Sequence, residues 1–488
     1  MKIYHSTRKL SNTATADEAV IRGIAPDGGL YVPDEFAKMD LEKLLNVSAY
    51  ELFARVLMGI LDGYSYEEML SIVKKGYEGR FETADITPTV KVGDMYILEL
   101  FRGPTSAFKD VALSLLPHFV TRAARNLGVT DEIRILTATS GDTGKAALAG
   151  FADVPGTSIA VFYPDGGVSA VQRKQMVTQP GKNVHVCAVR GNFDDAKTGV
   201  KRIFADKQLA ERLAARGVRF SSANSINLGR LAPQAAYYFK AYLDLVRMGR
   251  IAMGDKVDFA VPTGNFGDIL AGEYARRMGL PVGRLICASN ANRVLTDFIE
   301  TGVYDRRREF FKTASPSMDS LVSSNLERCL YLMSGGDCDL VCDLMKRLSE
   351  NGVYAAPESL MENFRASFAA GCADDAAALD EISRVWRENG YLMDPHTAVG
   401  SRVAREYMAK NQSANPMVVL STASPYKFAQ DVLHAIGGGA AEGFDALDAL
   451  SAMTGVPVPE NLSSLRELED IHTRVVDIEG MADFAAQE

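Results

Sequence analysis

The chain has 488 residues, of which 47% are hydrophobic and 24% are charged, proportions that are ordinary for a globular protein of two or three domains. Its net charge of −9 argues against a nucleic-acid partner or an anionic membrane surface. No stretch has the apolar length of a membrane span, and residues 1–6 lack the apolar core of a signal peptide, so we expect a cytoplasmic protein. The six cysteines form no C-x-x-C pair, and we expect no metal site.

Residues 1–90 are predicted to form a separate, mostly helical N-terminal domain. Apolar residues recur with helical periodicity over 41–61 and again over 66–77. The stretch that precedes them, 23–33, is rich in glycine and proline, which indicates turns.

From about residue 91 onward the pattern changes to strand, glycine-bearing loop and helix, repeated several times. Strands are predicted at 133–137, 158–163, 184–189, 257–261, 285–289 and 417–420. Strands that alternate with helices imply right-handed crossovers and parallel sheets. The fold class is therefore α/β, with two parallel-sheet domains packed by helices.

The two sheet domains are interleaved along the chain. We assign residues 91–130 and 231–430 to a large α/β domain, with a helical insertion at about 300–400. Residues 131–230 are predicted to form a smaller α/β domain, and residues 431–488 a C-terminal helical tail. Ligands bind such sheets at the carboxyl ends of the strands, so the loops there are the candidate sites.

A single lysine, Lys109, stands where a predicted strand ends and a helix begins. An apolar stretch at 96–101 precedes it, Gly103-Pro104 breaks the chain, and a helical apolar pattern follows from Val111. In a dry cleft the pKa of a lysine falls and its amine becomes a nucleophile that can form Schiff bases. The alternative is a surface lysine on an exposed first turn, and this stretch alone favours that alternative.

Two loops between a strand and a helix have the residues of an anion site, because glycines let consecutive backbone N–H groups converge at the positive end of a helix. One loop consists of Gly264, Asn265, Phe266, Gly267 and Asp268. The other consists of Thr139, Ser140, Gly141, Asp142, Thr143 and Gly144. For each loop, an ordinary capped helix start is an equally good interpretation.

Two further stretches are dense in hydrogen-bonding side chains. The stretch 221–230 contains Asn224, Ser225, Asn227 and Arg230, and the stretch 421–425 contains Thr422 directly after an apolar strand. A hydroxyl group at the end of a buried strand is placed to meet a ring nitrogen or another polar ligand atom. Turn chemistry is the alternative, and either stretch taken singly favours it.

Together these stretches resemble the threonine synthase family, which belongs to the fold-type-II pyridoxal-phosphate enzymes (the tryptophan synthase β-like group). Segments 103–110, 138–144, 264–268 and 421–428 are similar to the family's cofactor-lysine segment, substrate loop, cofactor-phosphate loop and the segment beneath the pyridine ring. They occur in the expected order, and Tyr4 with 6–8 and 27–33 match the family's N-terminal domain. The residues that depart from the family pattern are Lys145, Ser424 and Tyr426.

The resemblance implies pyridoxal 5'-phosphate as the cofactor and Lys109 as its Schiff-base lysine. It further implies that the residues cradling the cofactor phosphate are Gly264, Asn265, Phe266, Gly267 and Asp268, and that the Thr422 hydroxyl meets the pyridine nitrogen. The residues implied for the substrate carboxylate are Thr139, Ser140, Gly141, Asp142, Thr143 and Gly144, with Asp142 positioning the loop.

The substrate phosphate needs an anion pocket of its own. We expect this pocket to consist of Asn224, Ser225, Asn227 and Arg230. An arginine is well suited to it, because its guanidinium forms paired hydrogen bonds with phosphate oxygens. Arg102 and Lys145 are rivals for the same role.

The family's reaction converts O-phospho-L-homoserine and water to L-threonine and phosphate, by γ-elimination and then β-hydration, as the last step of threonine biosynthesis. Lys109 is expected to remove an α-proton and later a β-proton as general base. The nearest alternative is a pyridoxal-phosphate-dependent dehydratase or phospho-lyase acting on a related amino acid. A non-catalytic protein that keeps the fold is a third interpretation, against which the lysine and both anion loops argue. The expected state is a monomer or homodimer.

Overall fold

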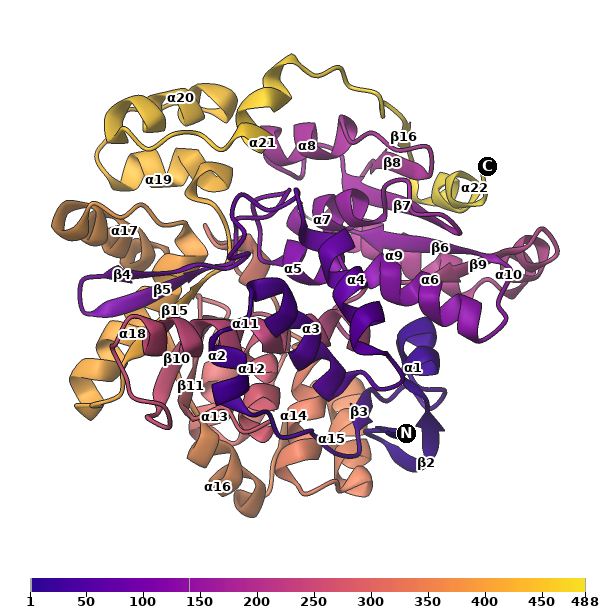
Figure 1. Cartoon of the computed structure of the whole chain (residues 1–488). Helices are drawn as coiled ribbons and strands as arrows, with labels where there is room; N and C mark the ends of the chain where they lie inside the picture. The colour runs from indigo at the N-terminus through magenta and orange to yellow at the C-terminus, as the bar shows by residue number, and fades with distance from the viewer. Residues whose placement is uncertain (1, 140, 488) are drawn as a thin grey trace.

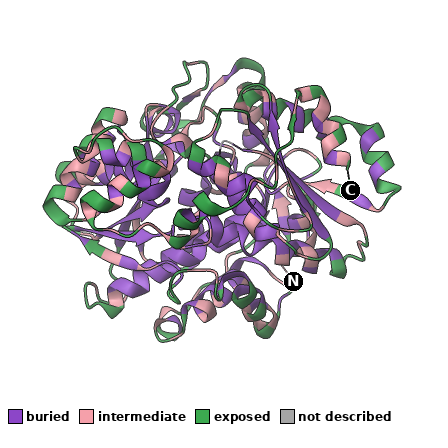
Figure 2. Cartoon of the chain, turned by 90° about the horizontal axis from the view of Figure 1, so that it is seen from above, coloured by how far each residue is buried: buried purple, intermediate pink, exposed green. Residues whose placement is uncertain are grey.

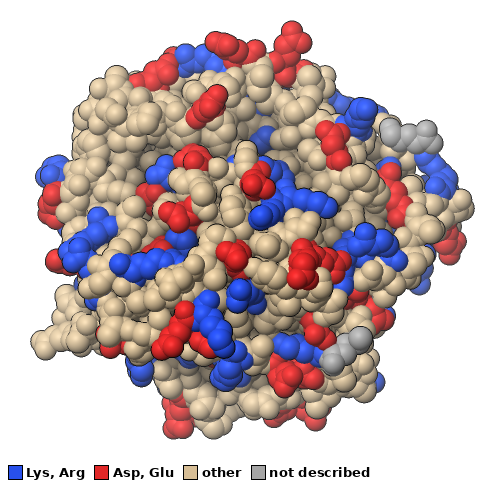
Figure 3. Space-filling model, viewed as in Figure 1, with Lys and Arg blue, Asp and Glu red and all other residues tan. Residues whose placement is uncertain are grey.

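The computed structural model describes residues 2–139 and 141–487, and its two main sheets lie side by side (Figure 1). Within the described residues, no helix is long and apolar enough to cross a bilayer. Figure 2 shows that the central strands of the two main sheets are buried, whereas the helices around them expose one face. In Figure 3, Lys and Arg lie among Asp and Glu over the face shown.

The N-terminal part combines a small sheet with helices. Its elements are β1 (Tyr4–Ser6), β2 (Lys9–Ala14), α1 (Ala16–Arg22), β3 (Tyr31–Pro33), α2 (Leu41–Leu45), α3 (Ala49–Ile60) and α4 (Tyr66–Tyr77). The strand order is β2-β1-β3, and both pairings are antiparallel. Ser48 caps α3 by accepting a hydrogen bond from the Glu51 backbone N–H, and the Glu51 side chain returns to the Ser48 backbone, so the helix starts at a capping box.

The larger sheet has six strands. Its order is β14 (Phe368–Cys372), β11 (Val282–Ser289), β10 (Val257–Pro262), β15 (Met417–Ser421), β5 (Met95–Glu99) and β4 (Thr89–Val92). All neighbours are parallel except β4, which is antiparallel to β5. The helices that contact its strands include α11 (Leu228–Arg247), α12 (Gly267–Arg277), α13 (Val294–Thr301) and α18 (Pro395–Asn411), and α5 (Lys109–Leu113) and α6 (Leu116–Asn126) pack on α11.

The smaller sheet has five parallel strands. Its order is β16 (Val475–Val476), β8 (Val184–Val189), β7 (Thr157–Pro164), β6 (Glu132–Ala138) and β9 (Val218–Ser221). The surrounding helices are α7 (Asp142–Phe151), α8 (Ala170–Val177), α9 (Phe193–Ala205), α10 (Lys207–Ala214) and α22 (Met481–Ala486). These two sheets, parallel except for the edge strand β4, confirm the predicted α/β fold class.

Residues 300–400 contain more than helices. The helices are α14 (Leu326–Met333), α15 (Cys338–Asn351), α16 (Glu358–Ser367) and α17 (Asp375–Asn389), with the 3₁₀ turn η1 (Pro316–Met318). The strands are β12 (Val303–Asp305), β13 (Val353–Ala355) and the sheet edge β14.

Beyond β15 come η2 (Pro425–Phe428), α19 (Ala429–Ala435), α20 (Gly443–Thr454), α21 (Glu460–Ser463), η3 (Ser464–Glu467) and η4 (Ile478–Gly480). The segment expected to be a helical tail thus also supplies strand β16 to the smaller sheet. The division of the chain into domains stays a prediction.

Candidate active site

Lys109 is the first residue of α5, and its position follows from the pairing of two central strands. Strands β5 and β15 are parallel neighbours, so the loops at their carboxyl ends leave the sheet together. The Phe108 backbone N–H donates to the Thr422 carbonyl at 2.9 Å, and the Ser424 N–H donates to the Ser106 carbonyl at 3.1 Å. The sheet therefore brings the predicted cofactor lysine beside the predicted ring-contacting threonine.

The Lys109 amine is buried, with 8% of the residue exposed. Burial lowers the pKa of Lys109 to about 8, and the nearby Asp142 carboxylate opposes this shift. An amine with a pKa near 8 is neutral for a useful fraction of the time at physiological pH, as a nucleophile or general base must be.

A cavity of about 800 Å³ opens beside Lys109. Eight of the predicted site residues line it together, namely Lys109, Thr139, Thr143, Asn224, Ser225, Asn227, Arg230 and Asn265. They come from loops and helices that follow strands of both main sheets, from the loop before α11 and from α11 itself. A cavity of this size is typical of small-molecule sites.

The charges around this cavity have one sign. Among the residues that the structure describes, its lining contains Arg22, Lys109, Lys197, Lys201 and Arg230 but no aspartate or glutamate. Clefts lined by one sign of charge concentrate ligands of the opposite sign. The cavity is therefore suited to an anionic ligand.

Arg230 is the most deeply buried of these cations, with 4% of the residue exposed. Its Nη1 donates to the Ala223 carbonyl at 2.8 Å. Its Nε, although buried, has no hydrogen-bond partner in the described part of the chain. Burial lowers the pKa of Arg230 to about 10. A buried cation without an anionic partner is costly, so this side chain is suited to a ligand anion.

The rivals for the phosphate role lie elsewhere. Arg102 is paired with Glu99 at 2.7 Å and with Glu82 at 2.8 Å. The Lys145 amine donates to Gln179, and neither Arg102 nor Lys145 lines the cavity. Both cations thus have protein partners of their own.

The other residues predicted to contact the substrate phosphate, Asn224, Ser225 and Asn227, form different hydrogen bonds within the protein. The Asn227 side chain accepts from the Gly229 N–H at 2.8 Å and donates to the Val20 carbonyl at 2.8 Å, so it caps α11 and ties it to α1. The Ser225 hydroxyl donates to Asn224 Oδ1 at 3.2 Å. The direct contact of these three side chains with a phosphate stays a prediction.

The predicted carboxylate loop is held by one threonine. Thr139 Oγ1 accepts from the Gly141 N–H at 3.0 Å and from the Gly144 N–H at 2.9 Å. Gly141 has a φ of 141°, which few other residues adopt. Asp142 is buried outside the cavity lining, whereas Ser140 lies outside the described residues.

The predicted cofactor-phosphate loop is a tight turn at the start of α12. Phe266 adopts the left-handed conformation with a φ of 64°, and the Gly267 N–H donates to Asn265 Oδ1 at 2.8 Å. A Cβ on Gly264 would lie 3.0 Å from the Ser317 carbonyl oxygen, so the turn leaves little room for a side chain there. This glycine-bearing helix start, adjoining a cavity with a buried lysine, fits the phosphate of pyridoxal phosphate.

Asp268 is the last residue of this loop and lies buried in the first turn of α12. Its Oδ1 accepts a hydrogen bond from the Tyr237 hydroxyl, while its buried Oδ2 has no hydrogen-bond partner among the described residues. Burial raises the pKa of Asp268 to about 7, although Tyr237 and Lys109 oppose the shift. Thr422 is buried as well and lies outside the cavity lining, so the contact of its hydroxyl with a pyridine nitrogen stays a prediction.

One face of α9 forms a wall of the cavity that the sequence reasoning did not identify. This face consists of Phe193, Lys197, Val200, Lys201 and Phe204. Their spacing places them on one side of a helix, and that periodicity is the signal that could have found them. Arg22, at the end of α1, is a further lining residue that was missed.

Three family models match the chain. Residues 3–77 match "Threonine synthase N terminus", residues 85–370 match "Pyridoxal-phosphate dependent enzyme", and residues 397–486 match "Threonine synthase, C-terminal". Fold and site together define a fold-type-II pyridoxal-phosphate-dependent enzyme.

Named relatives narrow this class. Threonine synthase of Saccharomyces cerevisiae is 36% identical, with 90% of each chain covered. The crystal structure of pyridoxal-phosphate-bound threonine synthase from Brucella melitensis has a TM-score of 0.89 and 36% identity, and covers 100% of this chain and 99% of that one. The chain belongs to the threonine synthase family. Human threonine synthase-like 1 is 41% identical over 86% of this chain, but the chain spans 58% of that protein.

Proposed function

We propose that this chain converts O-phospho-L-homoserine and water to L-threonine and phosphate, with pyridoxal phosphate held at Lys109. The observation that supports the proposal most directly is that Lys109 and Arg230 line the same cavity, whose described lining has no carboxylate. Such a cavity suits a substrate that has a reactive amine and also bears two anionic groups. A monomeric or homodimeric state and a cytoplasmic location belong to the same proposal.

The cofactor, when bound, supplies an electron-withdrawing ring that makes the protons of the substrate amino acid removable. Lys109 then moves protons at the α- and β-carbons, because burial lowers its pKa to about 8 and leaves part of the amine neutral near that pH. Arg230 orients the substrate phosphate through its Nε, which has no hydrogen-bond partner among the residues that the structure describes. The backbone of the loop 139–144, held by Thr139, receives the substrate carboxylate.

The turn before α12 holds the cofactor phosphate in this proposal, through backbone N–H groups at the helix start. Asn265 is the turn residue that lines the cavity. Thr422 would hold the pyridine nitrogen of the cofactor, and a hydroxyl partner would leave that nitrogen mostly unprotonated. The bound cofactor would then withdraw electrons more weakly, and Lys109 would have to contribute more through proton transfer at the α- and β-carbons.

Product analysis tests the reaction. The full chain loaded with pyridoxal phosphate is incubated with O-phospho-L-homoserine, and threonine, 2-oxobutanoate and phosphate are measured. Threonine and phosphate in equal amounts are expected. Phosphate with 2-oxobutanoate in place of threonine would instead establish a phospho-lyase. The Lys109→Ala variant is the control and should form neither organic product.

A further inference from the structure

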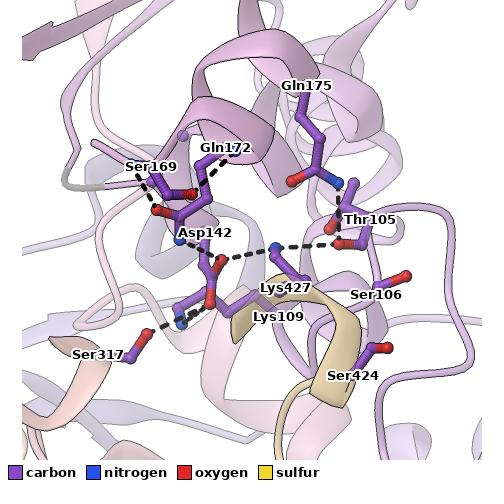
Figure 4. A network of polar contacts seen from close by, with 12 residues as sticks. Thr105, Ser106, Lys109, Asp142, Ser169, Gln172, Gln175, Ser317, Ser424 and Lys427 are labelled. Carbon is purple, nitrogen blue, oxygen red and sulfur yellow. Dashed lines mark hydrogen bonds and ion pairs between the residues drawn. The ribbon is translucent and has the colours of Figure 1, made fainter. Parts of the chain in front are cut away.

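Asp142 has hydrogen-bonding or charged partners on both of its carboxylate oxygens (Figure 4). Its Oδ1 accepts from Lys427 Nζ at 2.6 Å and from Gln172 Nε2 at 3.1 Å. Its Oδ2 accepts from the Ser317 hydroxyl at 3.3 Å and lies 4.0 Å from Lys109 Nζ. One carboxylate therefore joins the start of α7 to α8, η1, η2 and the lysine of α5.

Lys427 is a second buried amine close to Lys109. Its side chain has 0% exposure, and its Nζ donates to the Thr105 carbonyl at 3.0 Å as well as to Asp142. The Thr105 hydroxyl in turn donates to Asp110 at 2.6 Å. Lys427 thus joins the loop that begins α7 to the segment that leads into Lys109.

The charges explain why a second lysine is needed here. A buried carboxylate with no counterion is strongly unfavourable. Without Lys427, Lys109 would be the nearest cation to Asp142 and would be held as its charged partner. A charged ammonium is neither a nucleophile nor a base.

We propose that Lys427 is a positioning residue of the reaction, which neutralises and orients Asp142 so that the Lys109 amine stays available. This inference rests on the proposed role of Lys109 as the cofactor lysine. Lys427 itself touches no reacting atom in this scheme. It acts through Asp142, which the sequence reasoning placed in the substrate loop as a positioning residue.

The charged groups around Lys109 also support a role for Lys427 in keeping the pKa of Lys109 low. The charged groups that act on it are Asp142 of α7, Lys427 of η2, Arg230 of α11, Asp110 of α5 and Asp268 of α12. Burial is the main cause of its lowered pKa; Asp142 and Asp110 raise the pKa, whereas Lys427 and Arg230 lower it further. Removing Lys427 therefore raises the pKa of Lys109, and removing the Asp142 charge lowers it.

The test uses the full chain freed of its cofactor, and pyridoxal phosphate as the probe. The rate of cofactor attachment is followed by absorbance as a function of pH. The wild-type rate should have its midpoint near the Lys109 pKa of about 8. In Lys427→Met the midpoint should rise by about one pH unit or more, which slows attachment roughly tenfold at neutral pH.

Three variants separate this role from a general loss of structure. Lys427→Arg keeps the charge and should restore the wild-type midpoint. Asp142→Asn should lower the midpoint, and the double variant Lys427→Met/Asp142→Asn should return toward the wild type. Lys240→Met is the matched control, because Lys240 is also a buried lysine paired with an aspartate, Asp244, at 2.7 Å. Its midpoint should not move.

Two results would overturn the inference: a wild-type midpoint in Lys427→Met, or a double variant as impaired as Lys427→Met alone. If Lys427→Met does not fold, the double variant and Asp142→Asn still decide the question. Borohydride reduction of the wild-type protein and peptide mapping provide a separate check. Reduced cofactor on a lysine other than Lys109 would refute the proposed function itself, whereas a failed pH shift with cofactor on Lys109 refutes the role of Lys427.

Discussion

The backbone of Gly150 in α7 packs directly on the carbonyl group of Leu113, the last residue of α5. A Cβ built on Gly150 would lie 2.1 Å from the Leu113 oxygen and 2.9 Å from its carbonyl carbon. Helix α5 is the helix that begins at Lys109. The position of Lys109 therefore depends on the absence of a side chain two turns along a neighbouring helix.

Replacing Gly150 by alanine should destabilise the protein. In a helix this change ordinarily stabilises by about 1 kcal/mol, but here the new methyl group would meet backbone, which cannot rotate away. We expect a loss of about 1–3 kcal/mol in the free energy of unfolding, as for other overpacked sites, together with weaker cofactor binding. Urea unfolding measures it, and Gly439→Ala is the control because a Cβ there meets nothing within 4 Å. A Gly150→Ala variant as stable as the wild type would contradict the packing.

Arg230→Gln should raise the KM for a phosphorylated substrate by about tenfold or more, since charge-assisted hydrogen bonds contribute about 1.5–3 kcal/mol. The absorbance of the bound cofactor should stay unchanged, because Arg230 is assigned to the substrate. Steady-state kinetics and the visible spectrum measure the two effects. Arg102→Gln is the matched control, because Arg102 is paired with Glu99 and Glu82 outside the cavity. Loss of cofactor from Arg230→Gln would refute the assignment.

Asp268 should make stability fall as the pH rises. Its pKa in the folded protein is raised from 3.8 to about 7. Between these pH values the unfolded chain releases the Asp268 proton while the folded protein keeps it. The free energy of unfolding therefore falls as the pH rises, by up to about 4 kcal/mol. Urea midpoints at pH 5 and pH 8 should therefore differ less in Asp268→Asn than in the wild type.

A control for this pH effect is Asp305→Asn. Hydrogen bonding from Arg307 lowers the pKa of Asp305 to about 2, so the carboxylate is ionised in both folded and unfolded protein above pH 5. Its removal should leave the difference between the two midpoints as in the wild type. An Asp268→Asn variant with an unreduced difference would show that Asp268 is already charged in the folded state.

Glu327 should anchor the N-terminal part to α14. Its carboxylate accepts from Arg8 at 2.9 and 2.8 Å and from the Thr7 hydroxyl at 2.6 Å, and it is buried. Glu327→Gln should lower the free energy of unfolding by about 1.5–3 kcal/mol, measured by urea unfolding. Glu358→Gln removes the exposed pair with Arg365 and should cost less than about 1 kcal/mol. Equal losses in the two variants would argue against the anchor.

The alternation of strands and helices was enough to predict the two parallel sheets, because buried parallel strands form apolar runs that end at glycine-bearing loops. The same reasoning missed β1 and β3, which span Tyr4–Ser6 and Tyr31–Pro33. Strands of this length are too short to show a periodicity of two. Local pattern therefore identified the two main sheets but not the short strands of the N-terminal sheet.

The site was only partly visible in the sequence. The stretch around Lys109, taken alone, favoured a surface lysine, and only the resemblance to a family indicated a buried amine; the structure buries it. The ion pair of Asp142 with Lys427 could not be read from local pattern, since its two residues lie far apart in the chain and meet through the packing of both sheets. The same holds for Arg230, which has no carboxylate partner among the described residues because of how the folded cavity is lined.

The short strand β16 has a consequence for how the chain is made. It pairs with β8, so that Val475 lies opposite Ala188, and α22 packs on α9. During synthesis on a ribosome, β6 to β9 emerge long before residue 476. Until then β8 has an open edge, and exposed strand edges are templates for pairing with other chains. A nascent chain stalled before residue 475 should therefore depend on chaperones more than the finished one.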